Sequence, residues 1–342
     1  MSFIEIEIDN GTYKTIKWIE IKDQVMDIAS KKGDINSLEK NLKLLKKNLD
    51  SDEKYSTNAL FYASCKGHIN VLDWWLNSGL KLKYDCRAMD IASQNLNTKV
   101  LNWWLNSGLK LKYSKKSFHM NCAVTDTKKT IKTLNWWLES KLFLKYEDGM
   151  NYAIEELNIP ILKWWINSGL ELKYDKNIDY INVENKNCIK LIKLFIQHDL
   201  PMSYSETFLD QVSIKGNVKL LKWWFKSGLE IKYSRIAMDE SQFIKILQCW
   251  LDSGLELKYT NIAFEFAESP KVLQWWLDSG LKIIYEDLDE YLHNEDIDML
   301  NIWSKSGLPL IFNKNTSPIQ SEEIIQWCIK NKVSKKVYRK KK

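Results

Sequence analysis

Pairs of adjacent tryptophans are the feature of this sequence that could most directly carry chemistry. They recur along the 342-residue chain as Trp74, Trp75, Trp103, Trp104, Trp136, Trp137, Trp164, Trp165, Trp223, Trp224, Trp275 and Trp276. Exposed indoles in such a series could stack on bases or sugars. Each pair lies within an apolar pattern of helical period, so we expect the indoles to form a repeated core. At least one ring of each pair should stay partly exposed, because consecutive helix positions point in different directions.

A second candidate feature is a lysine placed directly before a tyrosine. The lysines are Lys83, Lys112, Lys145, Lys173, Lys232 and Lys258, and the tyrosines are Tyr84, Tyr113, Tyr146, Tyr174, Tyr233 and Tyr259. Stacked once per repeat, these residues would form two parallel surface rows that resemble a nucleic-acid groove. The alternative is that the tyrosine rings pack along the connector edge with their hydroxyls in solvent, while the lysines keep that edge soluble and unpaired. We favour the second interpretation, because phosphate binding needs concentrated positive potential.

The net charge of +6 does not belong to the body of the chain. Residues 332–342 contain seven basic residues and no acid, and the remainder has 43 basic and 44 acidic residues. The basic tail "KKVYRKKK" could be a nuclear-import or nucleic-acid-contacting peptide, or only a solubilising end.

Residue patterns for catalysis or metal binding are weak. The chain has no phosphate-binding glycine loop, no nucleophile elbow and no zinc-protease motif. The four histidines, His68, His119, His198 and His293, lie in different repeats. His119 and Cys122 could face each other on a helix, but two ligands do not make a zinc site. We therefore expect no catalytic residue, metal or cofactor, and scattered free thiols at the six cysteines.

The tryptophan pairs also reveal the elements that position them. Aligned positions recur every 26 to 33 residues, which is typical of stacked supersecondary units. Within "STNALFYASCKGHINVLDWWLNSGL", two groups of apolar residues have helical spacing and a Lys-Gly-His turn lies between them. Each repeat is therefore predicted to be two short helices. The second helix should end at a glycine in the left-handed C′ conformation. These glycines are Gly79, Gly108, Gly169, Gly228, Gly254, Gly280 and Gly307.

Two repeats lack that glycine, and we expect strained or differently closed helix ends at Lys141 and Asp199. After each glycine, five residues alternate apolar and polar and end in the tyrosine position, which Tyr204, Tyr285 and Phe312 occupy in three further repeats. This pattern predicts an extended connector. The residue after the tyrosine position is usually Asp, Ser, Thr or Asn, so the next helix should start there.

The N-terminal segment 2–19 alternates isoleucine with glutamate around Asn10 and Gly11, which predicts a β-hairpin. We expect this hairpin to cap the first repeat, the alternative being a small targeting element. The predicted organisation is a hairpin at 1–20, about ten repeats at 21–331 and a basic tail at 332–342. The chain has no apolar run of 18 residues or more, so no membrane segment is predicted.

The first complete repeat resembles an ankyrin repeat. Asn58 to Ala63 stand in place of the family's T-P-L-H-x-A pattern, Gly67 and His68 in place of its G-H, and Trp74 to Leu76 in place of its triple leucine. The resemblance implies an all-α, ankyrin-like helical-repeat solenoid that acts in protein binding. Most repeats here are shorter than the family's 33 residues, which would truncate the hairpin tips that commonly contact partners. The tryptophan-rich variant also resembles ankyrin-type proteins of giant DNA viruses of amoebae.

These patterns favour a non-enzymatic scaffold for protein–protein interaction, with an unidentified partner that would be a host protein if the viral resemblance holds. No F-box-like segment is recognisable. We expect an intracellular, cytoplasmic location, with the nucleus as the alternative that the tail suggests. The runner-up function is binding to nucleic acid or an anionic surface through the lysine and tyrosine rows and the tail. An enzyme with an unrecognised site would need a pocket of convergent polar groups.

Overall fold

The computed structural model describes residues 3–8, 12–17, 24–47, 55–118, 126–147, 149–265, 267–313, 319, 321–334 and 337. These residues are mostly helical. The chain forms two compact units, the first from Met1–Glu156 and Pro160–Tyr174, the second from Leu157–Ile159 and Asp175–Lys342. The division expected from the sequence, at residues 20 and 331, stays a prediction.

The strands lie at the start of the chain. β1 (Phe3–Ile8) pairs with β2 (Thr12–Lys17) in antiparallel register, with Phe3 opposite Lys17 and Ile8 opposite Thr12. The alternating isoleucines therefore lie in a hairpin strand, as their period of two predicts. The turn residues Asn10 and Gly11 lie outside the described residues.

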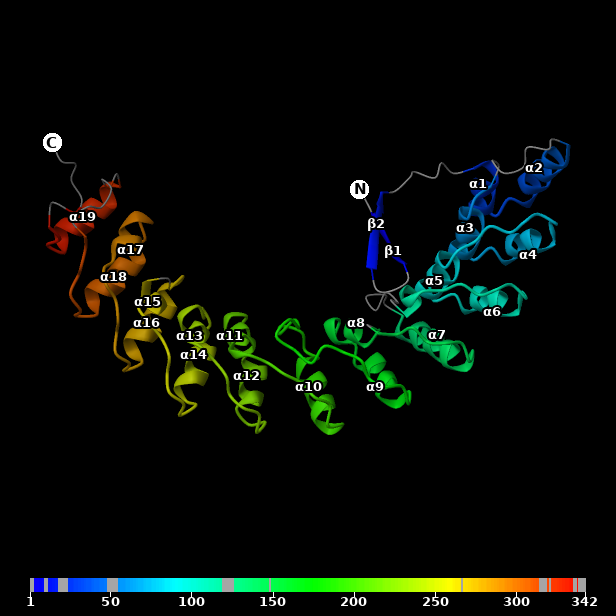
Figure 1. The fold of residues 1–342 in the computed structure, drawn as a ribbon. Coiled ribbons are helices and arrows are strands. Elements are labelled where there is room, and N and C mark those ends of the chain that lie inside the picture. The colour runs from blue at the N-terminus through cyan, green and yellow to red at the C-terminus, as the bar shows by residue number, and fades with distance from the viewer. Residues whose placement is uncertain are drawn as a thin grey trace. The chain divides into compact units, whose positions relative to one another are not determined.

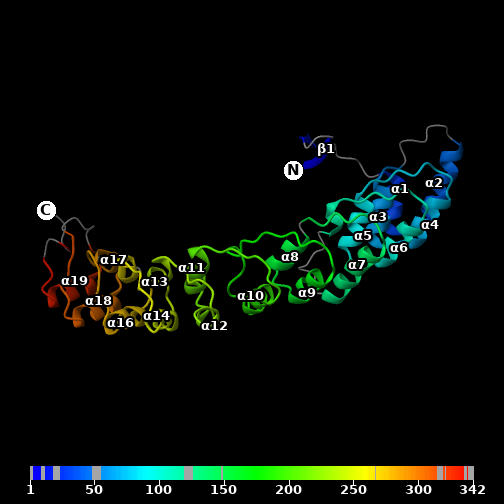
Figure 2. The same ribbon diagram turned by 60° about the horizontal axis from the view of Figure 1, so that its bottom comes forward.

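The first unit contains helices that alternate between two rows. They are α1 (Val25–Lys32), α2 (Ile35–Lys47), α3 (Asn58–Lys66), α4 (Ile69–Asn77), α5 (Arg87–Gln94), α6 (Thr98–Asn106), the 3₁₀ turn η1 (Lys115–Phe118), α7 (Thr127–Glu139), α8 (Gly149–Glu155) and α9 (Ile159–Asn167). α1 packs on α3 and α3 on α5, whereas α4 and α7 both pack on α6 (Figures 1 and 2). Each repeat thus contributes a first helix to one row and a second helix, which carries the tryptophan pair, to the other.

The second unit has the same arrangement, and its last three first helices are shortened to four or five residues. Its helices are α10 (Cys188–Gln197), α11 (Glu206–Ile214), α12 (Val218–Trp224), α13 (Ile236–Asp239), α14 (Ile244–Leu251), α15 (Ile262–Glu265), α16 (Pro270–Asp278), α17 (Asp289–His293), α18 (Ile297–Lys305) and α19 (Glu322–Lys330). α11, α13 and α15 pack in one row, and α10, α12, α14, α16, α18 and α19 in the other (Figure 1).

The second helices show why this sequence folds locally as it does. In α6, Val100, Leu101 and Trp104 are buried on one face. The Asn97 side chain caps the helix start by accepting a hydrogen bond from the Val100 N–H over 3.2 Å. At the other end, Gly108 has a φ of 74°, a backbone conformation that costs glycine little. The remaining six terminal glycines have φ between 72° and 81°.

The two glycine-less helix ends adopt the same left-handed backbone without the benefit of glycine. Lys141 after α7 has a φ of 57° and Asp199 after α10 has a φ of 49°. A side chain in this region clashes with the backbone, which costs about 1–2 kcal/mol. The helix end is therefore closed in the usual way and bears strain.

Two expectations about the first helices are wrong. Helix α10 has no helix before it among residues 175–187, where Ile178, Ile181 and Val183 are buried in turns. Most first helices also start later than the residue after the tyrosine position: α13 begins at Ile236 instead of Ser234. The physical reason is that these residues bond to the preceding repeat, as described below.

Candidate interaction surface

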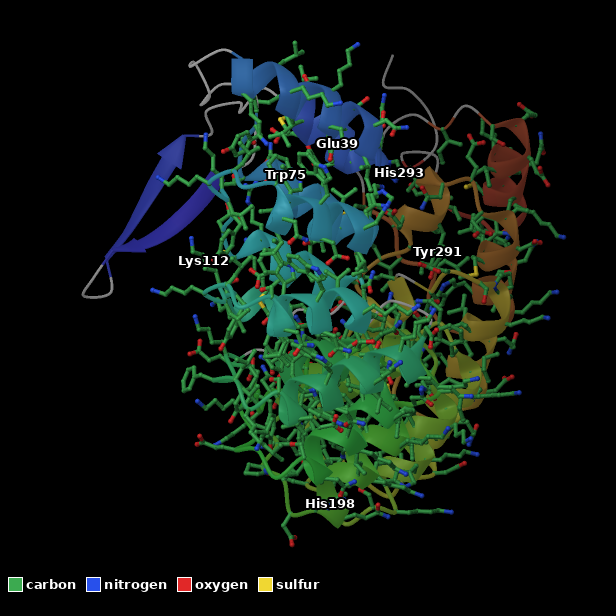
Figure 3. The ribbon with its side chains drawn as sticks, turned by 90° about the vertical axis from the view of Figure 1, so that its right-hand side faces the viewer. Glu39, Trp75, Lys112, His198, Tyr291 and His293 are labelled. Atoms are coloured by element: carbon green, nitrogen blue, oxygen red, sulfur yellow. The ribbon has the colours of Figure 1, made fainter. Side chains whose placement is uncertain are left out.

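The second indole of each pair lies in the core. Trp104, Trp137, Trp224 and Trp276 are at most 1% exposed, and Trp75 and Trp165 are equally enclosed. In the repeats without a complete pair, Phe195, Trp250 and Trp303 are buried at the same position. Figure 3 places Trp75 among the helices of the first unit. These rings fill the space between helices and leave no face open for a ligand.

The first indole of each pair lies at the outer face of the second helices. Trp74, Trp103, Trp164, Trp223 and Trp275 are half-buried, and Trp136 is 9% exposed. One ring of each pair is therefore less enclosed than its neighbour, because consecutive helix positions point in different directions. Each ring meets its buried neighbour edge-on, as in Trp103 and Trp104, whose planes form an angle of 88°.

The first indoles bond to the preceding repeat. The Trp103 Nε1–H donates to Asp73 Oδ1 over 2.6 Å, and Trp136 donates to Asn102 over 2.5 Å. The same bond joins Trp74 to Glu39, Trp164 to Asn135 and Trp275 to Gln248. We call the two positions that hold a tryptophan pair, or their equivalents in other repeats, the box. Except for Glu39, each acceptor is the residue directly before the box in its own repeat. This row of hydrogen bonds, which we call the indole ladder, fixes the register between neighbouring second helices.

Lysine replaces the acceptor where the next box offers no indole N–H. Lys163 precedes a repeat whose first box position is Leu194, and Lys222 precedes one with Cys249. Lys193 is followed by Trp223, and its ammonium lies 6.0 Å from the centre of that ring. The correspondence is partial, because Lys193 precedes a repeat with an indole and Gln274 precedes one with Ile302.

Buried serines accept hydrogen bonds from several second indoles. Trp75 donates to Ser30 Oγ over 2.8 Å, and Trp104 donates to Ser64 Oγ over 3.0 Å. Ser93 and Ser213 accept from Trp137 and Trp250 in the same way. Among the described residues, the buried Nε1 atoms of Trp276 and Trp303 have no such partner. The buried indole N–H groups are therefore hydrogen-bonded to serine in some repeats and lack this bond in others.

The lysine and tyrosine rows contact each other across repeats. The Lys112 ammonium lies 4.6 Å from the ring centre of Tyr84 in the preceding repeat and donates to the Tyr84 carbonyl oxygen over 3.0 Å. The same ring contact joins Lys83 to Tyr55, Lys145 to Tyr113, Lys173 to Tyr146, Lys232 to Tyr204 and Lys258 to Tyr233. Stacking in register thus places each ammonium over a ring of the preceding repeat. Lys112 lies at the edge of the first unit in Figure 3.

The tyrosine hydroxyls are not free in solvent either. Tyr113 donates to the Phe143 carbonyl oxygen over 3.0 Å, and Tyr259 donates to that of Lys282 over 3.0 Å. Tyr84, Tyr204, Tyr233 and Tyr285 donate to the next connector in the same way, and Tyr146 and Tyr174 are half-buried in the same register. Burial raises the pKa of Tyr113 and Tyr233, which keeps these phenols protonated as donors. The rows thus form a second ladder between repeats.

A third ladder consists of buried aspartates. Asp90, which is 4% exposed, accepts from the Ser114 N–H over 2.8 Å and from its hydroxyl over 2.6 Å. Asp27, Asp210 and Asp239 bind Ser56, Ser234 and Thr260 identically. This contact is what delays the helix starts. Burial raises the pKa of Asp90 despite these bonds.

The aspartate ladder was missed in the sequence, although a signal for it exists. Aspartate in a first helix is followed 21 to 29 residues later by Ser or Thr. In α3, Phe61 occupies the position of the aspartate. The residue at the corresponding serine or threonine position is Asp85, which binds Arg87 instead. Comparison of the repeats with each other would have revealed this pairing.

The described residues hold no group of three or more His, Cys, Asp or Glu side chains that could bind a metal ion. His68 Nε2 lies 3.3 Å from the Lys31 carbonyl oxygen, which is a contact between repeats. His198 and His293 are exposed on α10 and α17, and both are labelled in Figure 3. His119 and Cys122 lie outside the described residues. Within the part of the chain that is described, no helix has the length and apolar character to cross a membrane.

Comparison with known proteins adds no relative: no protein-family model matches this chain, and no curated protein matches it significantly.

Proposed function

We propose that this chain is an ankyrin-like helical-repeat solenoid that serves as a non-enzymatic scaffold for protein–protein interaction. The alternating two-row packing of short helix pairs within each unit supports the architecture. The β1–β2 hairpin would cover the exposed apolar side of the first repeat. The resemblance to ankyrin-type proteins of giant viruses supports a host protein as partner and the cytoplasm as location, with the tail as a candidate nuclear signal.

The observation that carries this proposal is the set of three ladders. Indole, lysine–tyrosine and aspartate contacts each join a repeat to its neighbour at fixed positions. Side chains in one register are therefore held at regular intervals before any partner binds. A surface that is ordered in advance loses little conformational entropy on binding, which is the advantage of a rigid scaffold.

Binding of nucleic acid through the lysine and tyrosine rows is not proposed. Stacking on bases needs open ring faces, and the ammonium groups of the next repeat already lie over six of the tyrosines. The ammonium groups of these lysines also contact rings and carbonyl oxygens of the chain itself.

The test is affinity capture of a binding protein, followed by reconstitution with purified components. Hydrogen exchange of the binary complex should show protection in matching positions of at least three consecutive repeats. The complex should survive when the chain ends at Asn331, and its affinity should change little with salt. Protection confined to one repeat or to the tail, or a complex that forms only with nucleic acid, would contradict the scaffold.

A further inference from the structure

The second unit carries a cluster of exposed lysines on the outer face of consecutive second helices. We call it the lysine patch, and it consists of Lys190 and Lys193 on α10, Lys219 and Lys222 on α12, Lys245 on α14 and Lys271 on α16. No salt bridge involving these lysines is found among the described residues. Six exposed lysines thus lie on four neighbouring second helices.

The geometry brings these charges together. Lysines three residues apart, such as Lys219 and Lys222, lie on one helix face. α12 packs between α10 and α14, and α14 packs on α16, so the lysines of successive helices form rows across the repeats. Lys219, Lys245 and Lys271 line one open hollow of about 680 Å³. Three of the six charges therefore face the same space.

An exposed aromatic ring also lines this hollow. Phe243 is 45% exposed and lies against Gly216 at the end of α11. A Cβ at Gly216 would come within 2.8 Å of the ring, so only glycine allows this contact. The hollow thus combines three lysines with an apolar ring, and no acidic residue lines it.

Acidic side chains near the patch are engaged or lie at its margin. Asp252 and Asp278 are at the far ends of α14 and α16, where they accept hydrogen bonds from Gln248 and Gln274 over 2.8 and 2.9 Å. Glu240 and Glu268 lie in the links before α14 and α16. The patch therefore has a positive centre and a negative border.

We propose that the lysine patch binds an extended acidic segment of a partner protein, with its carboxylates on the lysine rows and an apolar side chain on Phe243. This inference rests on the proposed scaffold function and names the chemistry of one partner. Packed helices lie about 8–10 Å apart, and an extended chain rises about 3.3 Å per residue. An acidic residue at every third position would therefore meet one repeat after another, and about ten residues would reach from α10 to α16.

A peptide fits this surface better than a nucleic acid does. A phosphate backbone carries a charge at every nucleotide and would continue toward the border carboxylates Asp252 and Asp278. Stacking would have a single exposed ring, Phe243, in the hollow. An acidic peptide can place uncharged residues over Gln248 and Gln274, where the lysine row is interrupted.

The experiment measures binding of a labelled peptide to the full chain by fluorescence anisotropy. The peptide has glutamate at every third position over about ten residues and a leucine near its centre. A peptide of the same composition with its glutamates adjacent is the sequence control, and a single-stranded oligonucleotide of similar length is the competing ligand. The charge-reversal variant is Lys219→Glu, Lys245→Glu and Lys271→Glu together.

The chain offers a matched control variant. Lys99→Glu, Lys132→Glu and Lys163→Glu reverse the same number of exposed lysines on second helices of the first unit. At low ionic strength the patch variant should bind the spaced peptide about tenfold more weakly, because it replaces three attractive charges by three repulsive ones. The control variant should differ from the parent by less than about twofold. Phe243→Ala should weaken binding by a smaller factor, and far-UV circular dichroism should show all variants folded.

The outcomes separate this inference from the scaffold function. Absent binding of the spaced peptide, equal loss in both lysine variants, or equal affinity for the adjacent-glutamate peptide would overturn it. Tighter binding of the oligonucleotide that depends on the patch would assign the patch to nucleic acid instead. If a captured partner binds the patch variant undiminished, the scaffold function stands and the acidic-segment inference fails.

Discussion

The early repeats of the first unit and the late repeats of the second unit bury the same ring in different polar surroundings. Trp104 and Trp276 are both at most 1% exposed. The Trp104 N–H donates to Ser64 in the first helix of the preceding repeat, whereas the Trp276 N–H has no acceptor in the described structure. The indole ring can therefore be fully buried whether or not its N–H donates a hydrogen bond.

The difference follows from the length of the first helix. α3 runs over nine residues and presents Ser64 in its last turn, whereas α13 and α15 are four residues long. Both short helices end before the position that would hold the serine. In the second of them, the chain then continues to the buried Ala267. Shortening a repeat thus preserves the second-helix row and removes the acceptor that the first-helix row supplies.

The largest expected effect tests whether packing is equivalent in the two regions. Trp104→Ala and Trp276→Ala should each lower the free energy of unfolding by about 3–5 kcal/mol, because each leaves a large cavity in the core. Urea unfolding followed by far-UV circular dichroism measures this loss. Trp103→Ala is the matched control and should cost less, because its ring is half-buried. A small effect of Trp276→Ala alone would show that the late repeats are loosely packed.

A milder substitution separates the hydrogen bond from the ring. Trp104→Phe should destabilise the chain by about 1–3 kcal/mol more than Trp276→Phe, since it leaves the buried Ser64 hydroxyl without its donor. Trp276→Phe removes a donor that has no partner, which offsets the loss of ring area. Urea unfolding of the two variants under identical conditions measures the difference between their free energies of unfolding. Equal losses would indicate that Trp276 finds an acceptor in solution, such as a bound water.

The helical period, the helix ends and the buried second indole could be predicted because they depend on local signals. The spacing of Val100, Leu101 and Trp104 defines one helix face within a single turn, and Gly108 marks its end. The length of the first helices could not be predicted in this way. Turns that bury Ile178, Ile181 and Val183 have the same apolar content as a short helix.

Contacts between repeats were harder to predict because they join residues far apart in the sequence. The rows that contain Lys112 and Tyr84 were recognised, but the placement of the ammonium on the preceding ring depends on the stagger of one repeat against the next. The lysine patch was missed for another reason. Charge was balanced over the whole body of the chain, and this average conceals the six lysines on the second helices α10, α12, α14 and α16, because the segments between these helices carry the compensating acids.

The glycine-less helix ends extend the comparison to the backbone. Lys141→Gly in the first unit should stabilise the chain by about 1 kcal/mol, because glycine relieves the strain of a positive φ. Asp199→Gly in the second unit should give a smaller gain, since aspartate tolerates this conformation better than lysine does. Gly108→Ala is the reverse control and should be destabilising by a similar amount. A gain at Asp199 that equals or exceeds the gain at Lys141 would contradict the argument. Thermal unfolding monitored by circular dichroism can resolve these differences.

The smallest expected effect concerns the aspartate ladder, which survives in both regions although the serine acceptors do not. Asp289 in the second unit has the equivalent contact, since it accepts from the Asn313 N–H over 3.0 Å. Burial raises the pKa of Asp90 in the first unit and of Asp289 in the second. Each folded carboxyl therefore holds its proton to a higher pH than the unfolded one, and its contribution to stability falls as the pH rises above about 4 through the folded pKa. Asparagine has no such titration.

The destabilisation caused by Asp90→Asn or Asp289→Asn should consequently shrink as the pH is raised from acid to neutral. Asp126 is the control of opposite sign, because its bond from the Lys129 N–H lowers its pKa. Asp126→Asn should cost more stability at neutral pH than in acid. Urea midpoints across this pH range measure the three trends. If Asp90 and Asp289 differ in sign, then shortening the first helices has changed the aspartate ladder as well as the indole contacts, and the two regions differ in more than one buried donor.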